Sequence, residues 1–268
     1  RNLLKSYAQN MMPSPDIFPV PLIHISETNS TNNYLQSLCS KQKVEELTVV
    51  VADFQTSGRG QRGNSWESDS GKNLLFSIVI FPEFLEARRQ FLISQIISLA
   101  IKEELDTYTT DISIKWPNDI VMNKKKVCGI LTEMSTEIDY INYVVIGVGI
   151  NVNQKVFDEE LKEKATSLMI ETGAPVKRSA LIAAVMKHFE INYALFMENG
   201  DLSGLQESYN EMLVNRGKEV RILEPGNEYN AHAYGINETG ELIVRTQKGE
   251  EKHIFAGEVS VRGIYGYV

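Results

Sequence analysis

Four apolar segments follow one another closely in the middle of the chain, and their spacing limits the fold more than any other feature. They cover residues 112–115, 120–122, 127–135 and 140–150. Each is rich in the β-branched and aliphatic residues that favour strands. The N-K-K-K run at 123–126 predicts a hairpin turn. Parallel neighbours would need crossover connections of a dozen or more residues, for which there is no room. The spacing therefore predicts antiparallel pairing rather than a doubly wound sheet.

The rest of the first 214 residues adds more strands and several helices. Periodicity predicts further strands at residues 20–26, 47–52 and 74–81. It predicts helices at about residues 31–42, 88–105, 178–198 and 203–213. Between two of the strands, residues 53–73 are polar and rich in glycine, which indicates a long loop. Loops of this length inside a compact domain are usually functional or disordered.

The sequence changes character after Asn215-Arg216-Gly217. Five short strands fit between Lys218 and Val268, separated by P-G-N, N-E-T-G and K-G-E turns. This pattern predicts a small β-barrel. We therefore expect three regions: an N-terminal extension or expression remnant at 1–19, a main domain at 20–214, and a small barrel at 215–268.

Composition and charge exclude several functional classes. The 268 residues are 43% hydrophobic, enough to form a core. A net charge of −8 argues against sequence-independent binding of nucleic acid, which needs clustered Lys and Arg. The two cysteines and four scattered histidines show no disulfide or metal-binding spacing. We see no secretory signal and no apolar run close to the length of a membrane span. We therefore expect a soluble, cytoplasmic protein that binds neither nucleic acid nor membrane.

The segment G-R-G-Q-R-G at 58–63 matches the glycine spacing of a dinucleotide-binding fingerprint. Such a fingerprint must open a helix, whereas here a polar stretch and another strand follow. A solvated glycine turn is the plain alternative. Arg59 and Arg62 favour an anion site, because glycines let backbone N–H groups approach an anion and arginine suits carboxylate and phosphate.

Three further segments each have a structural and a functional interpretation. K-W-P-N-D at 115–119 places Lys115 at a strand end, either as an edge lysine before a turn or as a cation aimed at an anion. K-V-C-G-I-L at 126–131 places Gly129 in a strand, as a bulge or a point of close approach. G-V-G-I-N-V-N at 147–153 ends a strand with small residues before an amide. None is specific by itself.

The order of these segments is more specific than any one of them. With S-T-N at 30–32 and D-F-Q at 53–55, they resemble the catalytic domain of biotin protein ligases (biotin–acetyl-CoA-carboxylase ligases) over about residues 20–265. G-E-V-S-V-R at 257–262 resembles the C-terminal strand of that family. The resemblance implies an α+β fold with a mixed, largely antiparallel sheet flanked by helices, related to class II aminoacyl-tRNA synthetases. It implies a catalytic domain at 20–214 and an SH3-like barrel after it.

The resemblance also implies roles for residues. The positions that bind biotin correspond to Ser30, Thr31, Asn32, Gln55, Arg59, Gly60, Gln61 and Lys115. Within this set, residues 59–61 match the loop that closes over the carboxylate and the adenylate, and Lys115 matches the lysine beside the reacting groups. The nucleotide region corresponds to Arg62, Trp66, Asn118 and Asn151. We expect Arg59, Arg62 and Lys115 to be the catalytic cations, with Mg²⁺ accompanying ATP and no metal ligands identified.

The implied reaction has two steps. Biotin and ATP form biotinyl-5′-AMP and pyrophosphate, and biotin then passes to a lysine of a biotin carboxyl carrier protein or domain. Because the substrate carboxylate is the nucleophile, no serine or cysteine nucleophile is needed. A lipoate–protein ligase and a non-catalytic biotin-binding protein remain alternatives. A synthetase acting on tRNA is disfavoured by the acidic charge balance. The oligomeric state stays open, with a homodimer as one option.

Two departures from the family pattern affect these expectations. Many relatives have arginine where this chain has Gln61, which would weaken the grip on the adenylate or shift that work to Arg62. Some relatives carry an N-terminal helix-turn-helix, and the stretch before S-T-N is too short for one. We therefore expect no repressor function.

Overall fold

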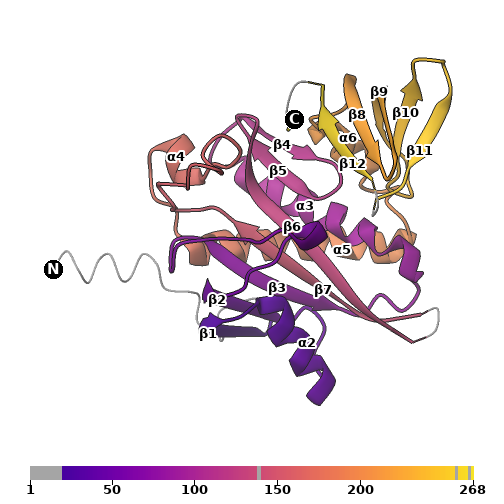
Figure 1. Cartoon of the computed structure of the whole chain (residues 1–268). Helices are drawn as coiled ribbons and strands as arrows, with labels where there is room; N and C mark the ends of the chain where they lie inside the picture. The colour runs from indigo at the N-terminus through magenta and orange to yellow at the C-terminus, as the bar shows by residue number, and fades with distance from the viewer. Residues whose placement is uncertain (1–19, 138–139, 257–258, 265–266) are drawn as a thin grey trace.

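The computed structural model describes residues 20–137, 140–256, 259–264 and 267–268, without the side chains of Arg62 and Tyr140. The described chain forms a large sheet flanked by helices and a smaller sheet beside it (Figure 1). This α+β architecture is the one expected from the sequence.

The large sheet has seven strands. In spatial order they are β1 (Leu22–Thr28), β2 (Val49–Gln55), β3 (Leu74–Ile80), β7 (Tyr140–Ile150), β6 (Lys125–Glu137), β5 (Asp119–Met122) and β4 (Ile112–Lys115). β1 and β2 pair in parallel, and every other neighbouring pair is antiparallel. The predicted antiparallel run from residue 112 to 150 is confirmed, and the sheet is mixed because β1 is joined to β2 through a helix.

Two local predictions need correction. The turn predicted at 123–126 is shorter, because Asn123 and Lys124 alone take left-handed backbone angles, with φ of 49° and 65°. The two following lysines already belong to β6. The loop predicted at 53–73 is also shorter, because β2 continues to Gln55 and a 3₁₀ turn, η1, forms at Gln61–Gly63.

The main helices lie close to the predicted positions. They are α2 (Thr31–Lys41), α3 (Phe91–Leu105), α5 (Arg178–Asn199) and α6 (Gln206–Met212), with a 3₁₀ turn η2 (Ala87–Arg89) before α3. Ser30 begins α2 by accepting a hydrogen bond from the backbone N–H of Asn33. The five-residue helix α4 (Leu168–Thr172) was not predicted, because one turn is too short to show a helical period.

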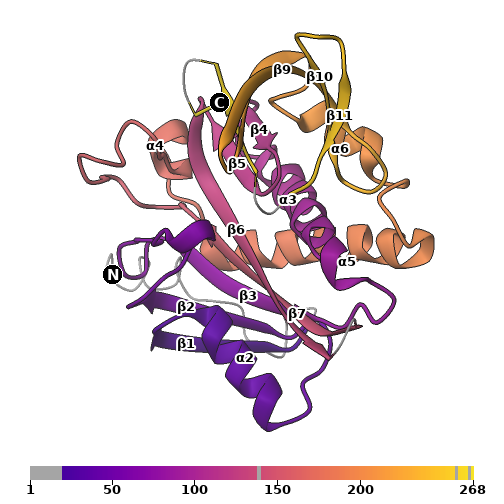
Figure 2. The ribbon, with the colours of Figure 1, turned by 45° about the vertical axis from the view of Figure 1, so that its right-hand side comes forward.

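Alternating side chains assign the two faces of the large sheet to different helices. Val50, Val79 and Val145 form a small apolar cluster with Leu35 of α2. The intervening residues, such as Val49, pack in the main core together with α3 and α5. Figure 2 shows α2 separate from the α3–α5 pair. One face therefore carries a single short helix, and part of it remains available for a site.

The second sheet contains the five predicted C-terminal strands. In spatial order they are β11 (Glu251–Ile254), β10 (Leu242–Thr246), β9 (Asn227–Ile236), β8 (Lys218–Glu224) and β12 (Ser260–Gly263). All of its strand pairs are antiparallel. Its apolar residues belong to the same hydrophobic cluster as those of the large sheet. We retain the division at residues 214 and 215 as a proposal about domains.

Helix α5 modifies one expectation from the sequence. Within the described ranges it is the one helix long and apolar enough, by length and composition, to cross a membrane. The core helix of a soluble protein passes the same test, and 44% of the relevant window of α5 is buried inside the structure. Leu181, Val185 and Phe189 of α5 are fully buried in the main core. We therefore interpret α5 as a core helix.

Candidate active site

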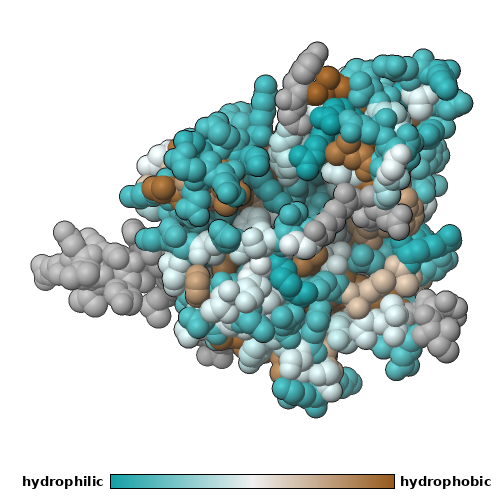
Figure 3. Space-filling model, in the orientation of Figure 1, coloured by the Kyte–Doolittle hydropathy of each residue, from teal (hydrophilic) through white to brown (hydrophobic). Residues whose placement is uncertain are grey.

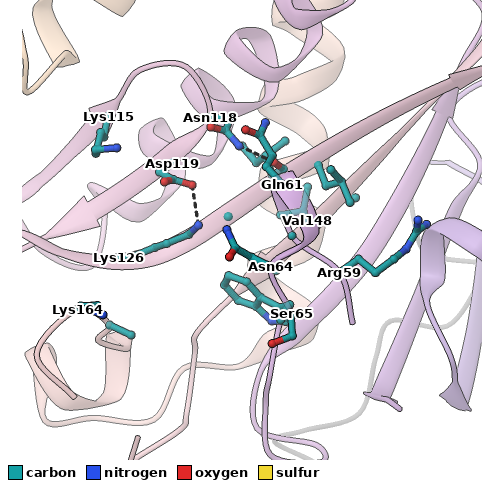
Figure 4. Close-up of a pocket in the computed structure, with 18 of the residues that line it drawn as sticks. Arg59, Gln61, Asn64, Ser65, Lys115, Asn118, Asp119, Lys126, Val148 and Lys164 are labelled. Atoms are coloured by element: carbon teal, nitrogen blue, oxygen red, sulfur yellow. Dashed lines mark hydrogen bonds and ion pairs between the residues drawn. The ribbon is translucent and has the colours of Figure 1, made fainter. Parts of the chain in front are cut away.

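One cavity of about 510 Å³ collects nearly all of the residues predicted to form the site. Those that line it are Ser30, Thr31, Asn32, Gln55, Arg59, Gly60, Gln61, Trp66, Lys115, Asn118 and Asn151. The remaining predicted residue is Arg62, whose side chain lies outside the described part of the chain. The surface in Figure 3 is largely hydrophilic and is hollowed near its middle. Figure 4 shows the interior of the cavity.

The floor of the cavity is a strip of backbone without side chains. On the α2 face of β7, Val145 is followed by Gly147 and Gly149, and Gly129 of β6 pairs with Gly149. A Cβ atom at Gly147 would lie 2.4 Å from Asn32 Oδ1, and one at Gly149 would lie 2.4 Å from the Trp66 ring. Neither distance is tolerable, so glycine is required where these two side chains lie on the sheet. Gly129, for which the sequence left open a bulge or a point of close approach, thus forms the floor together with Gly147 and Gly149.

The same contacts order the cavity along β6 and β7. Asn32 lies on Gly147, Trp66 lies on both Gly149 and Gly129, and the Lys126 side chain lies next to Gly129. Polar amides therefore occupy one part of the floor, an aromatic ring the middle, and a cation the part beyond it. This sequence of groups suits a ligand that is polar at one end and anionic further along.

The amide end is held by a network of hydrogen bonds. Gln55 Oε1 accepts hydrogen bonds from the Thr31 backbone N–H at 2.8 Å and from Thr31 Oγ1 at 3.1 Å. Ser77 Oγ of β3 lies 2.7 Å from Thr31 Oγ1 and 2.6 Å from Asn32 Oδ1. Asn32 donates to Glu133 Oε2 at 2.7 Å. These bonds hold the start of α2 against three strands and give the polar groups fixed positions.

Arg59 of the glycine-rich segment is engaged with protein groups. Its NH2 nitrogen donates to Asn33 Oδ1 at 2.6 Å and to Glu133 Oε2 at 2.8 Å. In Figure 4 its side chain points away from Lys115 and Lys126. The segment also forms a short antiparallel bridge between Arg59 and Ser65. Arg59 lines the cavity as predicted, but its guanidinium lies apart from the group of lysines.

Two lysines and one aspartate form the charged wall. Lys115 ends β4 and Asp119 begins β5, and the two residues pair across the Trp116–Pro117–Asn118 turn, whose peptide bond before Pro117 is cis. Lys126 Nζ of β6 lies 2.8 Å from Asp119 Oδ1 (Figure 4). The Lys126 side chain is 32% exposed, whereas Lys115 is only 6% exposed. Lys126 is therefore the more accessible cation of the two.

Burial and charge shift the ionisation of this wall in opposite directions. Desolvation lowers the pKa of Lys115 to about 8, although the carboxylate of Asp119 works against the shift. Desolvation would raise the pKa of Asp119, but the charges of Lys126 and Lys115 outweigh it and hold that pKa below its ordinary value. Asp119 is therefore ionised at neutral pH, whereas Lys115 begins to lose its proton near pH 8.

The two predicted amides of the nucleotide region mainly hold strands together. Asn118 Nδ2 donates to the Ile130 carbonyl at 2.7 Å, which ties the β4–β5 turn to β6. Asn151 Nδ2 donates to the Thr166 carbonyl at 3.1 Å, and its backbone N–H donates to the Val127 carbonyl. Both residues line the cavity, and both are fixed by these bonds.

Several lining residues had no role assigned from the sequence. They are Asp119, Lys126, Phe157, Leu161, Lys164, Arg262 and Tyr267. Asp119 and Lys126 lie inside segments singled out from the sequence, so those segments were the available signal. No sequence signal pointed to Tyr267, which reaches the cavity from 148 positions beyond Asp119.

The described acidic residues around the cavity do not form a metal-binding cluster. Among the described residues no group of three or more His, Cys, Asp or Glu could hold a metal ion. The Asp119 carboxylate is bound by Lys126 and by the Tyr267 hydroxyl.

Comparison with known proteins agrees with this geometry. Residues 25–151 match the model of the Biotin/lipoate A/B protein ligase family, and residues 217–262 match the Biotin protein ligase C terminal domain. The chain is 35% identical over 246 residues to the bifunctional ligase/repressor BirA of Bacillus subtilis, covering 90% of this chain and 74% of that protein. It is 34% identical to the BirA of Bacillus spizizenii, covering 88% and 72%.

A solved structure gives the same result in three dimensions. The biotin protein ligase from Aquifex aeolicus, in complex with biotin and ATP, superposes with a TM-score of 0.80 at 32% identity. The match covers 90% of this chain and 98% of that one. Sequence motifs, fold and cavity agree, and the chain belongs to the biotin protein ligase family.

Proposed function

We propose that this chain activates biotin with ATP and transfers the biotinyl group to a lysine of a carrier protein. The observation that carries the proposal is that fixed amide and hydroxyl groups, an aromatic ring and a lysine pair follow one another in one cavity along β6 and β7. The polar end is suited to the ureido ring of biotin. The lysines are suited to the place where the biotin carboxylate meets the α-phosphate.

The first step joins two anions, and the charged wall addresses that difficulty. A carboxylate oxygen of biotin attacks the α-phosphorus, a new P–O bond forms, and the bond to pyrophosphate breaks. Cations that stabilise the negative charge developing on the phosphoryl oxygens lower the barrier. Fixed positions for both reactants supply a further part of the rate.

Within the wall we propose different roles for the two lysines. Lys126 contacts the reacting carboxylate and phosphate, because it is the more exposed and lies beside Gly129 on the cavity floor. Lys115 is the buried member of the pair and contributes its charge to the wall of the cavity. The sequence led us to expect Lys115 beside the reacting groups. We instead propose that Lys126 makes the direct contact.

The second step forms an amide bond. The neutral amine of the acceptor lysine attacks the acyl carbon of biotinyl-5′-AMP, a C–N bond forms, and the bond to the AMP oxygen breaks. The departing AMP and one proton leave with this step. Free lysine has a pKa of about 10.4, so the amine must lose a proton before it attacks. We propose a biotin carboxyl carrier protein or domain as the acceptor.

The remaining expectations complete the proposal. Mg²⁺ enters bound to ATP, because this ion is commonly held by substrate phosphates with few protein carboxylates. In that role it would screen the triphosphate charge, while the residues described above bind and orient the reactants. We further propose a cytoplasmic location, and a homodimer as the assembly to be tested by sedimentation.

Pyrophosphate exchange tests the first step directly. Labelled pyrophosphate should enter ATP only when the protein, Mg²⁺ and biotin are present together. Mass spectrometry of the protein after incubation with biotin, ATP and Mg²⁺ should detect bound biotinyl-5′-AMP. Faster exchange with lipoate than with biotin would overturn the choice of substrate. Biotin binding without any exchange would identify a non-catalytic binding protein.

A further inference from the structure

Tyr267, a residue of the C-terminal region, contacts the charged wall of the cavity at two points. Its hydroxyl donates a hydrogen bond to Asp119 Oδ2. Its ring covers the ammonium group of Lys115, with Lys115 Nζ 4.2 Å from the ring centroid. A cation over an aromatic face is attracted by the ring quadrupole, and more strongly where water is excluded. One side chain thus holds both ends of the β4–β5 turn.

Asp119 is oriented by two partners as a result. Lys126 binds its Oδ1 atom, and Tyr267 binds its Oδ2 atom. Burial, followed by the charge of Asp119, raises the pKa of Tyr267 above its ordinary value, so the phenol keeps its proton and remains a donor. The two oxygens of the carboxylate therefore cannot rotate freely, and the position of Lys126 is tied to the same arrangement.

Lys115 has neighbours of both charge signs from every side of the wall. Asp119 of β5 supports its charged form, and Lys126 of β6 and Arg262 of β12 oppose it. The Tyr267 ring lies over the ammonium group and covers one side of it. Removing the ring would lose its attraction for the cation and would also admit water. Because desolvation is the largest influence on Lys115, the gain in hydration outweighs the lost attraction and favours the charged form.

We propose that Tyr267 is a positioning residue for adenylate formation, holding Lys115 and Asp119 in one arrangement so that the C-terminal region completes the active site. This inference rests on the proposed function, because the step it serves is the attack of biotin on ATP. Tyr267 acts through the lysines and makes no bond to the reacting atoms. Its hydroxyl and its ring have separable effects, and that separation makes the inference testable.

Two substitutions separate the hydroxyl from the ring. Tyr267→Phe keeps the ring over Lys115 and removes the bond to Asp119, whereas Tyr267→Leu removes both. Tyr234→Phe is the matched control, because Tyr234 is a half-exposed tyrosine of β9 that packs against His232 and does not line the cavity. Melting curves and circular dichroism establish that each variant is folded.

The first measurement does not depend on enzymatic activity. Competitive acylation of Lys115 across a pH series, read by peptide mass spectrometry, reports the pKa of that amine. We expect wild type, Tyr267→Phe and Tyr234→Phe to titrate near pH 8, and Tyr267→Leu to titrate higher by about one unit or more. An unchanged titration in a folded Tyr267→Leu variant would overturn the role of the ring.

The second measurement is biotin-dependent pyrophosphate exchange. Tyr267→Phe should lower kcat by about tenfold, as expected for a lost hydrogen bond to a charged group, and leave KM for biotin within about twofold. Tyr267→Leu should lower kcat further. A wild-type kcat in a folded Tyr267→Phe variant would overturn the role of the hydroxyl. If the Tyr267→Leu variant does not fold, the kcat of Tyr267→Phe alone decides whether Tyr267 is a positioning residue. Absence of exchange in wild type would reject the proposed function, while the titration would still test the ring contact.

Discussion

Lys115 is a charge held where burial disfavours it. Its pKa falls from 10.5 to about 8, because desolvation outweighs the attraction of Asp119. Below pH 8 the folded protein must therefore keep a charged group in a poorly hydrated place. A shift of this size corresponds to an unfavourable contribution of about 3 kcal/mol. Perturbed groups of this kind are common in functional sites, where stability is lost in favour of chemistry.

Replacing Lys115 with a neutral side chain of similar length should stabilise the protein. We expect Lys115→Met to raise the free energy of unfolding at pH 7 by up to about 3 kcal/mol. Between pH 8 and 10.5 the unfolded chain binds the lysine proton more tightly than the folded chain, so the free energy of unfolding of wild type rises with pH. The difference in free energy of unfolding between Lys115→Met and wild type therefore becomes smaller as the pH rises. Urea unfolding at pH 7 and pH 10 measures both values. An equal difference between Lys115→Met and wild type at pH 7 and pH 10 would contradict the lowered pKa of Lys115.

The two lysines should also differ in catalysis. We expect Lys115→Ala to reduce adenylate formation by about 100-fold or more and to leave the fold intact. Lys126→Ala should reduce it at least as much, and should additionally weaken ligand binding, because Lys126 is the exposed member of the pair. Pyrophosphate exchange at varied biotin concentration separates kcat from KM. Near-normal exchange in either variant would reject the role proposed for that lysine.

At the scale of the element, β7 shows how one strand serves both the core and the site. Its residues Val144, Ile146, Val148 and Ile150 belong to the main core under α3 and α5. On the opposite face, Gly147 and Gly149 replace the side chains that would otherwise cover the sheet. The strand retains one complete apolar face for packing and opens the other to a ligand, which is possible because successive side chains of a strand point to opposite faces.

Substituting Gly149 tests this arrangement. We expect Gly149→Ala to displace the Trp66 ring, because the new Cβ would lie 2.4 Å from it, and to raise KM for ATP by about tenfold or more. Stability should fall by about 1–3 kcal/mol. Thr136→Ala, at an exposed position of β6, is the matched control. Unchanged KM in Gly149→Ala would show that the position of Trp66 on the floor does not matter for the nucleotide.

At the scale of the whole molecule, the second sheet is joined to the first through the residues that carry the site. Trp116, in the turn between Lys115 and Asp119, is fully buried and donates from Nε1 to the Gly240 carbonyl at 3.1 Å. Gln95 of α3 donates to the same carbonyl at 2.8 Å. The N-E-T-G turn between β9 and β10 thus packs on α3 and on the site turn, and the two sheets should unfold together.

Two glycines in similar turns measure this contact. Gly240 and Gly249 both have left-handed backbone angles, with φ of 77° and 85°. A Cβ at Gly240 would lie 2.2 Å from Gln95 Oε1, whereas nothing lies within 4 Å at Gly249. We expect Gly249→Ala to destabilise by about 1–2 kcal/mol, from the backbone angle alone. Gly240→Ala should lower the free energy of unfolding by about 1 kcal/mol more than Gly249→Ala, and should also lower activity. Equal unfolding midpoints in urea would mean that the two sheets are not coupled here.

The sequence by itself determined the position of most elements and the antiparallel pairing of the strands between residues 112 and 150. Short connections between residues 112 and 150 left antiparallel pairing as the available geometry, and turn residues marked the five C-terminal strands. The order of motifs identified twelve expected site residues, and eleven of them line one cavity. These properties depend on local periodicity and on motif order, which are legible along the chain. The parallel β1–β2 pair and the one-turn helix α4 could not be predicted from the sequence, because neither has a local sequence signal of its own.

Only the tertiary structure decided how the charges are used. Asp119 meets Lys126 and Tyr267, and Arg59 meets Glu133, across separations of 7 to 148 positions in the chain. Which lysine is exposed and which is buried depends on what packs over each one, and burial in turn sets the pKa. The spacing of residues along the chain does not reveal which segments pack over each lysine. The path of the chain brings the C-terminal region over the β4–β5 turn, and this packing gives the two lysines of the wall different chemistry.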